Sequence, residues 1–232
     1  MKTKYYFFNK SKEKSFEKFS SNFLFEKLKK IENEISGKIN IALSGGNTPL
    51  PILEILQNED LTWSRYNFFL VDERCVPNEN PLSNFGNIRK VFFNQISSHS
   101  FPIIQDGISQ KESVVVYVNE IIKQVPLNEN SIPVFDLILL GMGDDGHTAS
   151  LFPNTKALLE ENKFVVFNEI PQLQTERITI TYPVLLNSKE IIVIVKGQNK
   201  KKIIKELYDE KPSEYPILKL TNSHSNLKWL IG

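Results

Sequence analysis

The chain has 232 residues, of which 41% are hydrophobic and 24% are charged, the composition of a globular protein with a substantial core. Its 28 basic and 27 acidic residues give a formal charge of +1, so no nucleic acid or other polyanion is indicated as a partner. The single cysteine, Cys75, excludes an internal disulfide framework and a cysteine-based zinc site, and it favours a cytosolic location, which we class as cytoplasmic.

The N-terminal segment contains basic residues, but its apolar part is too short for a signal peptide, and no small-residue cleavage site follows it. No apolar run approaches the roughly 20 residues that a membrane-spanning helix needs. We therefore expect no signal peptide, no membrane span and no membrane partner.

Amphipathic spacing predicts a helix near the N-terminus. Apolar residues recur every few positions from Phe16 to Ile35, and Gly37 is expected to end the helix. Ile39–Leu43 is predicted to be a short strand that leads into a Gly-rich loop. Pro49 suits the first turn of the helix that follows this loop.

The middle of the chain contains one clear strand and one ambiguous segment. Phe68–Val71 is predicted to be a buried strand, and Ser83 or Asn84 is expected to cap a helix that extends to about Ile96. The valines of Ser113–Val125 favour a strand, whereas the spacing of its apolar residues makes a helical face. We favour the helix.

The second half of the chain continues the alternation of strands and helices. The predicted strands are Val134–Leu140, Phe164–Phe167, Arg177–Thr181, Ile191–Val195 and Leu227–Leu230. Helices are expected near Thr155–Leu159 and Asn199–Tyr208. Alternation over the whole length predicts one α/β domain, residues 1–232, with a mostly parallel sheet flanked by helices.

The segment from Phe135 to Thr148 combines a buried strand with a Gly-rich turn that carries two carboxylates and a histidine. Ile138–Leu140 is an unbroken apolar run, typical of a strand that is covered on both faces. Open α/β sheets bind ligands at the carboxyl ends of their strands, and the turn carrying Asp145 and His147 is predicted to lie there. His147 is therefore predicted to be the reactive group of a site.

The loop Ser44-Gly45-Gly46-Asn47-Thr48-Pro49 lies between a predicted strand and a predicted helix. Its backbone N–H groups, its hydroxyls and the helix N-terminus favour an anion such as phosphate. It is neither a P-loop nor a dinucleotide-binding fingerprint, and a simple tight turn is an equally good interpretation. Arg177 and Lys200 would complete a three-sided phosphate clamp, although either cation alone is more often a surface charge.

Asp72-Glu73-Arg74 follows another apolar strand. A carboxylate there suits a base, and Arg74 suits an oxyanion or a hydroxylated substrate, with an internal ion pair as the alternative. The neighbouring Cys75 is interpreted as a packed small residue, and His99 and His224 as surface groups. Because the histidines form no metal-binding pair motif, a catalytic metal is not expected.

Together these motifs resemble the 6-phosphogluconolactonase family, which shares its fold with the glucosamine-6-phosphate deaminases. The matching blocks, in family order, are Ser44–Pro49, Val71–Pro77, Ser83-Asn84, Gly141–Pro153, Arg177-Ile178-Thr179 and Gly197–Lys200. The resemblance implies a Rossmann-like α/β domain of the glucosamine-6-phosphate deaminase-like fold. It also implies hydrolysis of 6-phospho-D-glucono-1,5-lactone to 6-phospho-D-gluconate, the second step of the oxidative pentose phosphate pathway.

The resemblance further implies roles for individual residues. His147 would act at the lactone with Arg74 nearby, and Asp145 or Asp72 would orient the imidazole. The 6-phosphate would be bound by Ser44, Gly45, Gly46, Thr48, Arg177 and Lys200. No metal or organic cofactor is expected. The expected partner is the small-molecule sugar phosphate lactone, and the chain would be a monomer or a homodimer.

Two alternative functions stay open at this point. Deaminases typically continue Asp-Gly-His with Ile-Ala-Phe-Asn-Glu-Pro, and their Glu assists the histidine, whereas this chain has Phe152 at the aligned position. They also tend to have Tyr where this chain has Arg74, and both differences favour the lactonase. A non-catalytic sugar-phosphate sensor is the other alternative, and the intact His147 motif argues against it.

Overall fold

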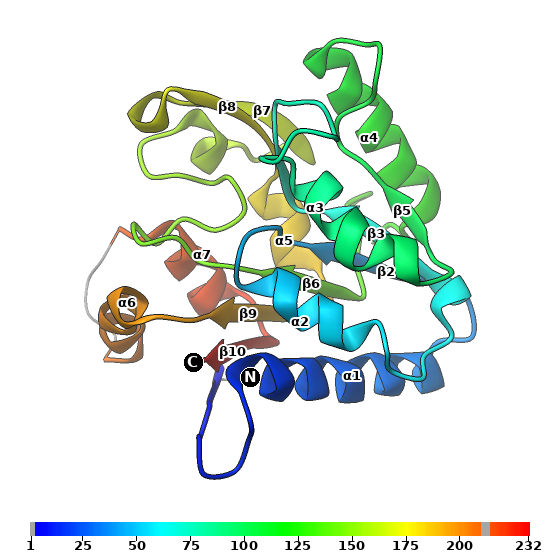
Figure 1. The fold of residues 1–232 in the computed structure, drawn as a ribbon. Coiled ribbons are helices and arrows are strands. Elements are labelled where there is room, and N and C mark those ends of the chain that lie inside the picture. Colours follow the sequence, from blue (N-terminus) through cyan, green and yellow to red (C-terminus); the bar gives the residue numbers. More distant parts are fainter. Residues whose placement is uncertain (1–2, 210–213) are drawn as a thin grey trace.

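A seven-stranded parallel sheet forms the centre of the computed structural model, which describes residues 3–209 and 214–232 (Figure 1). In spatial order the strands are β1 (Lys4–Phe7), β10 (Leu227–Ile231), β9 (Ile191–Val195), β6 (Leu137–Leu140), β2 (Ile39–Leu43), β3 (Tyr66–Leu70) and β5 (His99–Phe101). Every adjacent pair is parallel, so all the carboxyl ends meet at one edge. The predicted α/β class with a mostly parallel sheet is confirmed.

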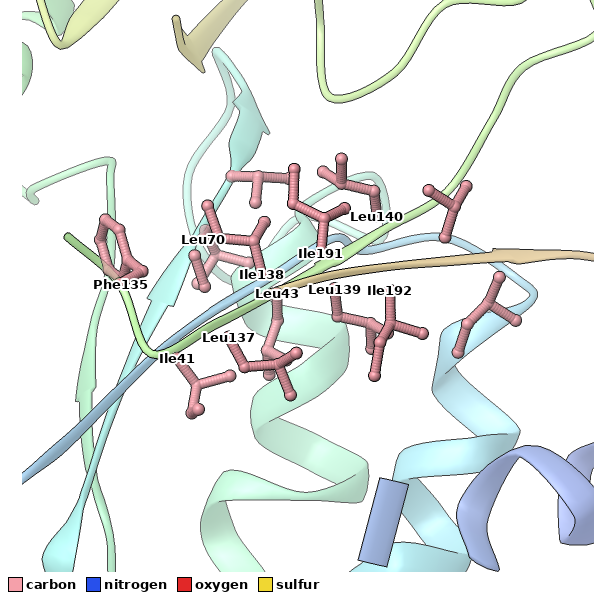
Figure 2. Packing of buried hydrophobic residues seen from close by; sticks show 14 of the residues in the cluster. Ile41, Leu43, Leu70, Phe135, Leu137, Ile138, Leu139, Leu140, Ile191 and Ile192 are labelled. Carbon is pink, nitrogen blue, oxygen red and sulfur yellow. The ribbon is translucent and has the colours of Figure 1, made fainter. Parts of the chain in front are cut away.

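The central strands are buried along their whole length. Every residue of β2, β3, β6 and β9 is shielded from solvent, as expected for strands that have apolar packing on both faces. Figure 2 shows how this works in β6, where Leu137 and Leu139 lie on one side of the strand and Ile138 and Leu140 on the other. Alternation of side chains along an extended backbone therefore supplies both halves of the core.

Seven α-helices in the described residues connect the strands. They are α1 (Phe16–Glu34), α2 (Pro49–Leu56), α3 (Asn84–Val91), α4 (Gln110–Gln124), α5 (Tyr182–Asn187), α6 (Gln198–Tyr208) and α7 (Pro216–Ser223). Along the chain α1 packs on α2, and α2 packs on α3. None of the helices in these ranges combines the length and the apolar character that crossing a bilayer requires.

The ambiguous segment Ser113–Val125 is helical, as we favoured. A capping box starts α4, in which the Ser109 hydroxyl accepts from the Glu112 backbone and the Glu112 carboxylate accepts from the Ser109 backbone. Tyr117 and Ile121 of this helix are fully buried. The apolar face of the helix outweighs the strand preference of its valines because that face packs against the core.

A second, three-stranded antiparallel sheet begins where β3 ends. Its order is β4 (Asp72–Arg74), β8 (Thr175–Ile180) and β7 (Val165–Ile170). Residues Asp72 and Arg74 are registered with Thr179 and Arg177 on β8. This small sheet therefore places the polar residues that follow β3 beside strand β8.

Several predicted elements differ from the observed ones. The predicted helix through Ile96 ends at Val91 and is followed by a 3₁₀ turn at Phe93–Gln95, and the helix expected near Thr155–Leu159 is a 3₁₀ turn, Lys156–Leu159. Two further 3₁₀ turns are Trp63–Arg65 and Pro171–Leu173. The short elements β1, β5, α5 and α7 were not expected. Segments this short are stabilised by packing rather than by their own periodicity.

Candidate active site

A pocket of ≈ 220 Å³ opens at the carboxyl edge of the main sheet, the position predicted from the order of the motifs. Loops after β2 and β6 form much of its wall, and α2, β4, α3, β9 and α6 contribute the other lining residues. Its lining residues are Ser44, Gly45, Gly46, Asn47, Thr48, Pro49, Asp72, Arg74, Asn84, Gly141, Met142, Gly143, His147, Thr148, Ala149, Ile194 and Lys200.

His147 lies in the turn after β6, and its side chain is 27% exposed. Its Nδ1 is 2.5 Å from Oδ1 of Asp145, which also accepts from the His147 backbone N–H at 3.1 Å. Because a carboxylate only accepts hydrogen bonds, Nδ1 is the protonated nitrogen of the neutral ring, and Nε2 carries the lone pair. Within the described residues no side chain or backbone group bonds Nε2, so this nitrogen is available to a ligand.

Two glycines of this turn are required by close contacts. A Cβ at Gly143 would lie 2.1 Å from Cε1 of His147 and would displace the imidazole. Gly146 has φ of +76°, and a Cβ there would lie 2.6 Å from the side chain of Tyr215. The Gly-rich sequence therefore allows the backbone to pass directly beside the imidazole.

Burial raises the pKa of the Asp145 carboxyl, but hydrogen bonds from the His147 side chain and backbone outweigh it and keep the pKa below its ordinary value. We therefore expect a ¹³C NMR titration to give the Asp145 carboxyl a midpoint below the ordinary value of an aspartate side chain. A carboxyl with a lowered pKa stabilises the fold above its ordinary pKa, and that stabilisation is lost as the pH falls through the folded value.

The variant His147→Ala provides the control for this titration. It removes the bond to Nδ1, so the Asp145 midpoint will move upwards. A wild-type midpoint at or above the ordinary carboxyl value, or a midpoint that His147→Ala leaves unchanged, would contradict the observed geometry.

The two carboxylates that were candidates for orienting the imidazole have different partners. Asp145 contacts His147, whereas Oδ2 of Asp72 accepts a hydrogen bond of 2.6 Å from the Ser150 hydroxyl. Arg74 lines the pocket beside Asp72, and its Nη1 donates to the Leu82 carbonyl. The geometry therefore assigns the contact with the imidazole to Asp145.

Glu73 lies behind this wall of the pocket and Asn84 lines it, and sequence analysis placed neither residue among the predicted site residues. The Glu73 carboxylate is fully buried and accepts from the backbone N–H groups of Arg74, Asn84 and Phe85, each at 2.7 Å, and from the Ser83 hydroxyl at 3.0 Å. Burial raises the pKa of Glu73, and the three N–H groups oppose that rise. In the sequence, only the position of Glu73 between Asp72 and Arg74 in the Val71–Pro77 block indicated a place near the site.

Asn84 links this wall to the predicted phosphate loop. Its Nδ2 donates to the Asp72 carbonyl at 3.0 Å, and a Cβ at Gly45 would lie 2.1 Å from its Oδ1. The loop after β2 can approach α3 this closely because residue 45 has no side chain.

The loop after β2 presents polar groups to the pocket. The Ser44 hydroxyl accepts from the Gly141 backbone N–H at 3.3 Å, and Thr48 makes no side-chain capping bond at the start of α2. Lys200, in the first turn of α6, has no ion-pair partner among the described residues. Backbone N–H groups, hydroxyls and an unpaired ammonium group are suited to a phosphate.

Arg177, the other predicted cation, is not among the residues that line the pocket. Its Nη1 donates to the Thr175 hydroxyl at 2.7 Å and to the Glu176 carbonyl at 3.2 Å. Burial and the positive charge of Arg74, its neighbour across the β4–β8 ladder, lower the pKa of Arg177. Arg177 therefore lies beside Arg74 without lining the pocket.

Solvent exposure decides the interpretation of the cysteine and of the two histidines outside the His147 motif. Burial raises the pKa of Cys75 to about 12, which suits a packed thiol and not a nucleophile. His99 is exposed, as predicted, but the prediction for His224 is wrong. That residue is 4% exposed, accepts from the Asn226 N–H at 3.1 Å and bonds the Ser188 carbonyl at 2.8 Å.

The polar sequence around His224 suggested a surface loop, whereas the chain folds this segment against α5. In the described ranges no three side chains of the types His, Cys, Asp or Glu gather as metal ligands.

The structure combines a parallel α/β sheet with a loop suited to phosphate binding and a His–Asp pair, both at the carboxyl edge of the sheet. These features are typical of enzymes that act on phosphorylated small molecules. Within that class, the family model described as glucosamine-6-phosphate isomerases/6-phosphogluconolactonase matches residues 12–229, and the chain belongs to this family. The family resemblance predicted from the motifs is thereby confirmed.

Individual relatives agree with this assignment. The chain is 39% identical to a 6-phosphogluconolactonase of Chlamydia pneumoniae over 84% of this chain and 76% of the relative. It is 34% identical to the 6-phosphogluconolactonase of a Synechocystis strain, over 84% and 82%. The crystal structure of 6-phosphogluconolactonase from Thermotoga maritima superposes with a TM-score of 0.82 at 28% identity, covering 100% of both chains.

Proposed function

We propose that the protein is a 6-phosphogluconolactonase, a carboxylic ester hydrolase that converts 6-phospho-D-glucono-1,5-lactone to 6-phospho-D-gluconate. The observation that carries the proposal is the His147–Asp145 pair with a free Nε2 in the pocket that the Ser44–Pro49 loop also lines. The names of the relatives support the same reaction. The substrate is then a small phosphorylated lactone of the oxidative pentose phosphate pathway.

In the proposed mechanism, Nε2 of neutral His147 removes a proton from a water molecule while the water oxygen attacks C1 of the lactone. The bond from C1 to the ring oxygen then breaks, and the imidazolium returns the proton to that oxygen. General acid–base assistance of this kind contributes about 10²–10⁴-fold to the rate. Asp145 stabilises the charged ring, and Arg74 stabilises the oxyanion that forms at C1.

We propose that Ser44, Gly45, Gly46, Thr48 and Lys200 bind the 6-phosphate. The hydroxyls, the backbone N–H groups and the ammonium group of these residues border the same pocket as His147. Arg177 stays a prediction for this site, because its guanidinium would have to leave Thr175 to reach the phosphate.

The deaminase reaction of the same family needs more carboxylate chemistry, because it opens a sugar ring and abstracts a C2 proton. Of the described side chains only that of Asp145 forms a hydrogen bond with the His147 ring, and the ring of Phe152 stacks on the imidazole. This environment favours hydrolysis of an activated ester, which needs one base and one oxyanion-stabilising group.

Turnover of freshly generated 6-phosphogluconolactone, coupled to 6-phosphogluconate dehydrogenase, tests the proposal. After subtraction of spontaneous hydrolysis we expect the protein to accelerate product formation, and we expect no ammonia release from glucosamine 6-phosphate. Absence of acceleration by the folded protein would overturn the lactonase. Ammonia release would then identify a deaminase, and phosphosugar binding without turnover would identify a sensor.

A cytosolic location, a single domain over residues 1–232 and a monomeric or homodimeric state remain predictions that accompany this function. Size-exclusion chromatography with light scattering will determine the oligomeric state.

A further inference from the structure

The ring of Phe152 stacks on the imidazole of His147. The ring centroids are 3.8 Å apart, and the ring planes differ by 25°. Phe152 is 6% exposed and does not line the pocket. Its ring therefore contacts the imidazole of His147 without occupying the space for a ligand.

The chain reaches this position by folding back on itself immediately after His147. Ala149 has φ of +49°, a left-handed conformation that is uncommon for a residue with a side chain. The N–H of Leu151 then bonds the carbonyl of Thr148 at 2.9 Å. Strain of this kind persists only where surrounding contacts enforce it.

Buried hydrogen bonds on Ser150 supply part of that enforcement. Its hydroxyl donates to Asp72 at 2.6 Å, and its N–H donates to the hydroxyl of Thr179 at 3.1 Å. Its carbonyl accepts from Nδ2 of Asn168, on β7, at 2.9 Å. Ser150, two residues before Phe152 in the chain, is thus held by hydrogen bonds to its hydroxyl, its N–H and its carbonyl.

The same Asn168 amide also holds the carbonyl of Phe152, through the side chain of Thr155. It donates to Oγ1 of Thr155 at 3.0 Å, and that hydroxyl donates to the carbonyl of Phe152 at 2.8 Å. Asn168 and Thr155 are both buried, so water does not compete for these bonds. The backbone on both sides of Phe152 is therefore tied to the small antiparallel sheet.

We propose that Phe152 is a positioning residue for His147 in the reaction proposed above. The Asp145 bond fixes only the Nδ1 edge of the imidazole, and the side-chain torsion that sets the ring plane of a histidine is intrinsically broad. A flat aromatic ring against the imidazole face restricts this torsion. The direction of the Nε2 lone pair into the pocket then depends on the Phe152 ring and on the Asn168 network behind it.

The variant Phe152→Leu tests this role because leucine retains apolar bulk but cannot stack. We expect kcat for lactone hydrolysis to fall by about 10- to 100-fold, the loss that a small misplacement of a reacting group causes. We expect KM to change by no more than about twofold, because Phe152 does not contact the pocket. Phe101→Leu is the matched control, since Phe101 stacks on Phe69 at 4.6 Å and does not line the pocket.

Histidine NMR provides a readout that does not depend on substrate. In the wild type the Phe152 ring current will shift the His147 ring protons upfield, and Phe152→Leu will move them downfield while Phe101→Leu leaves them in place. Assignment uses His147→Ala. Should Phe152→Leu fail to fold, as judged by the dispersion of the amide spectrum, Phe152→Met replaces it.

Unchanged kcat in a folded Phe152 variant, or unchanged His147 resonances, would overturn the positioning role. Loss of activity through KM alone would also overturn it. If the wild type does not hydrolyse the lactone, the proposed function fails, and the NMR comparison still decides whether Phe152 orients the imidazole.

Discussion

His147→Ala will lower kcat for lactone hydrolysis by about 10²–10⁴-fold, the contribution expected of a positioned general base. KM will change little, because the predicted phosphate-binding groups lie on other segments around the pocket. The measurement is the coupled assay with spontaneous hydrolysis subtracted. The expectation follows from the free Nε2 of His147 and from the Asp145 bond that holds the proton on Nδ1.

His99→Ala is the matched control for this substitution. It removes an exposed imidazole from the edge strand β5, outside the pocket lining, and we expect wild-type kcat. The buried His224 is a poor control, because its loss would leave the Asn226 N–H and the Ser188 carbonyl without partners. Near-wild-type turnover by His147→Ala would remove His147 from the chemistry.

Glu73→Gln will lower the free energy of unfolding by about 1–3 kcal/mol, the cost of leaving a buried hydrogen-bonding group unsatisfied. In the native chain both carboxylate oxygens accept, one from Arg74 and Asn84 and the other from Ser83 and Phe85. An amide has only one accepting oxygen, so its NH₂ group must face at least one backbone N–H. Urea unfolding monitored by circular dichroism measures the loss.

Glu79→Gln is the control for Glu73→Gln. The Glu79 side chain is 68% exposed and pairs with Arg89 at 3.1 Å, an arrangement that contributes at most about 1 kcal/mol. A Glu73→Gln variant that was as stable as the wild type would show that the four donors on Glu73 find other partners. It would also show that the wall carrying Arg74 and Asn84 does not depend on this carboxylate.

Glu73→Gln will also reduce lactone turnover at temperatures where the variant remains folded. The backbone of Arg74 and the start of α3 are both bonded to this carboxylate, and both contribute residues to the pocket. A change in kcat/KM that accompanies the stability loss would link the wall of the pocket to the buried carboxylate behind it.

Sequence patterns alone predicted the α/β class, most of the longer elements and the region of the site. Segments with strong apolar periodicity or unbroken apolar runs, such as Phe16–Ile35 and Ile191–Val195, were predicted correctly. A helix buried along one face has regularly spaced apolar residues, and a strand buried on both faces has a continuous apolar run. The Gly-rich loops were located because glycines that permit turns are visible without coordinates. Because β2, β3 and β6 run parallel, the motifs that follow them meet at one edge of the sheet.

Only the tertiary structure decided which of these residues touch one another. Side chains from distant segments, such as Asp72 and Ser150 or Gly45 and Asn84, meet because of packing between elements, and local patterns carry no record of such contacts. The choice of Asp145 over Asp72 as the partner of the imidazole, the location of Arg177 outside the pocket lining and the burial of His224 all belong to this group. A sequence specifies which chemical groups are present and which segments are regular, whereas hydrogen bonding and exclusion of water depend on the folded arrangement around each group.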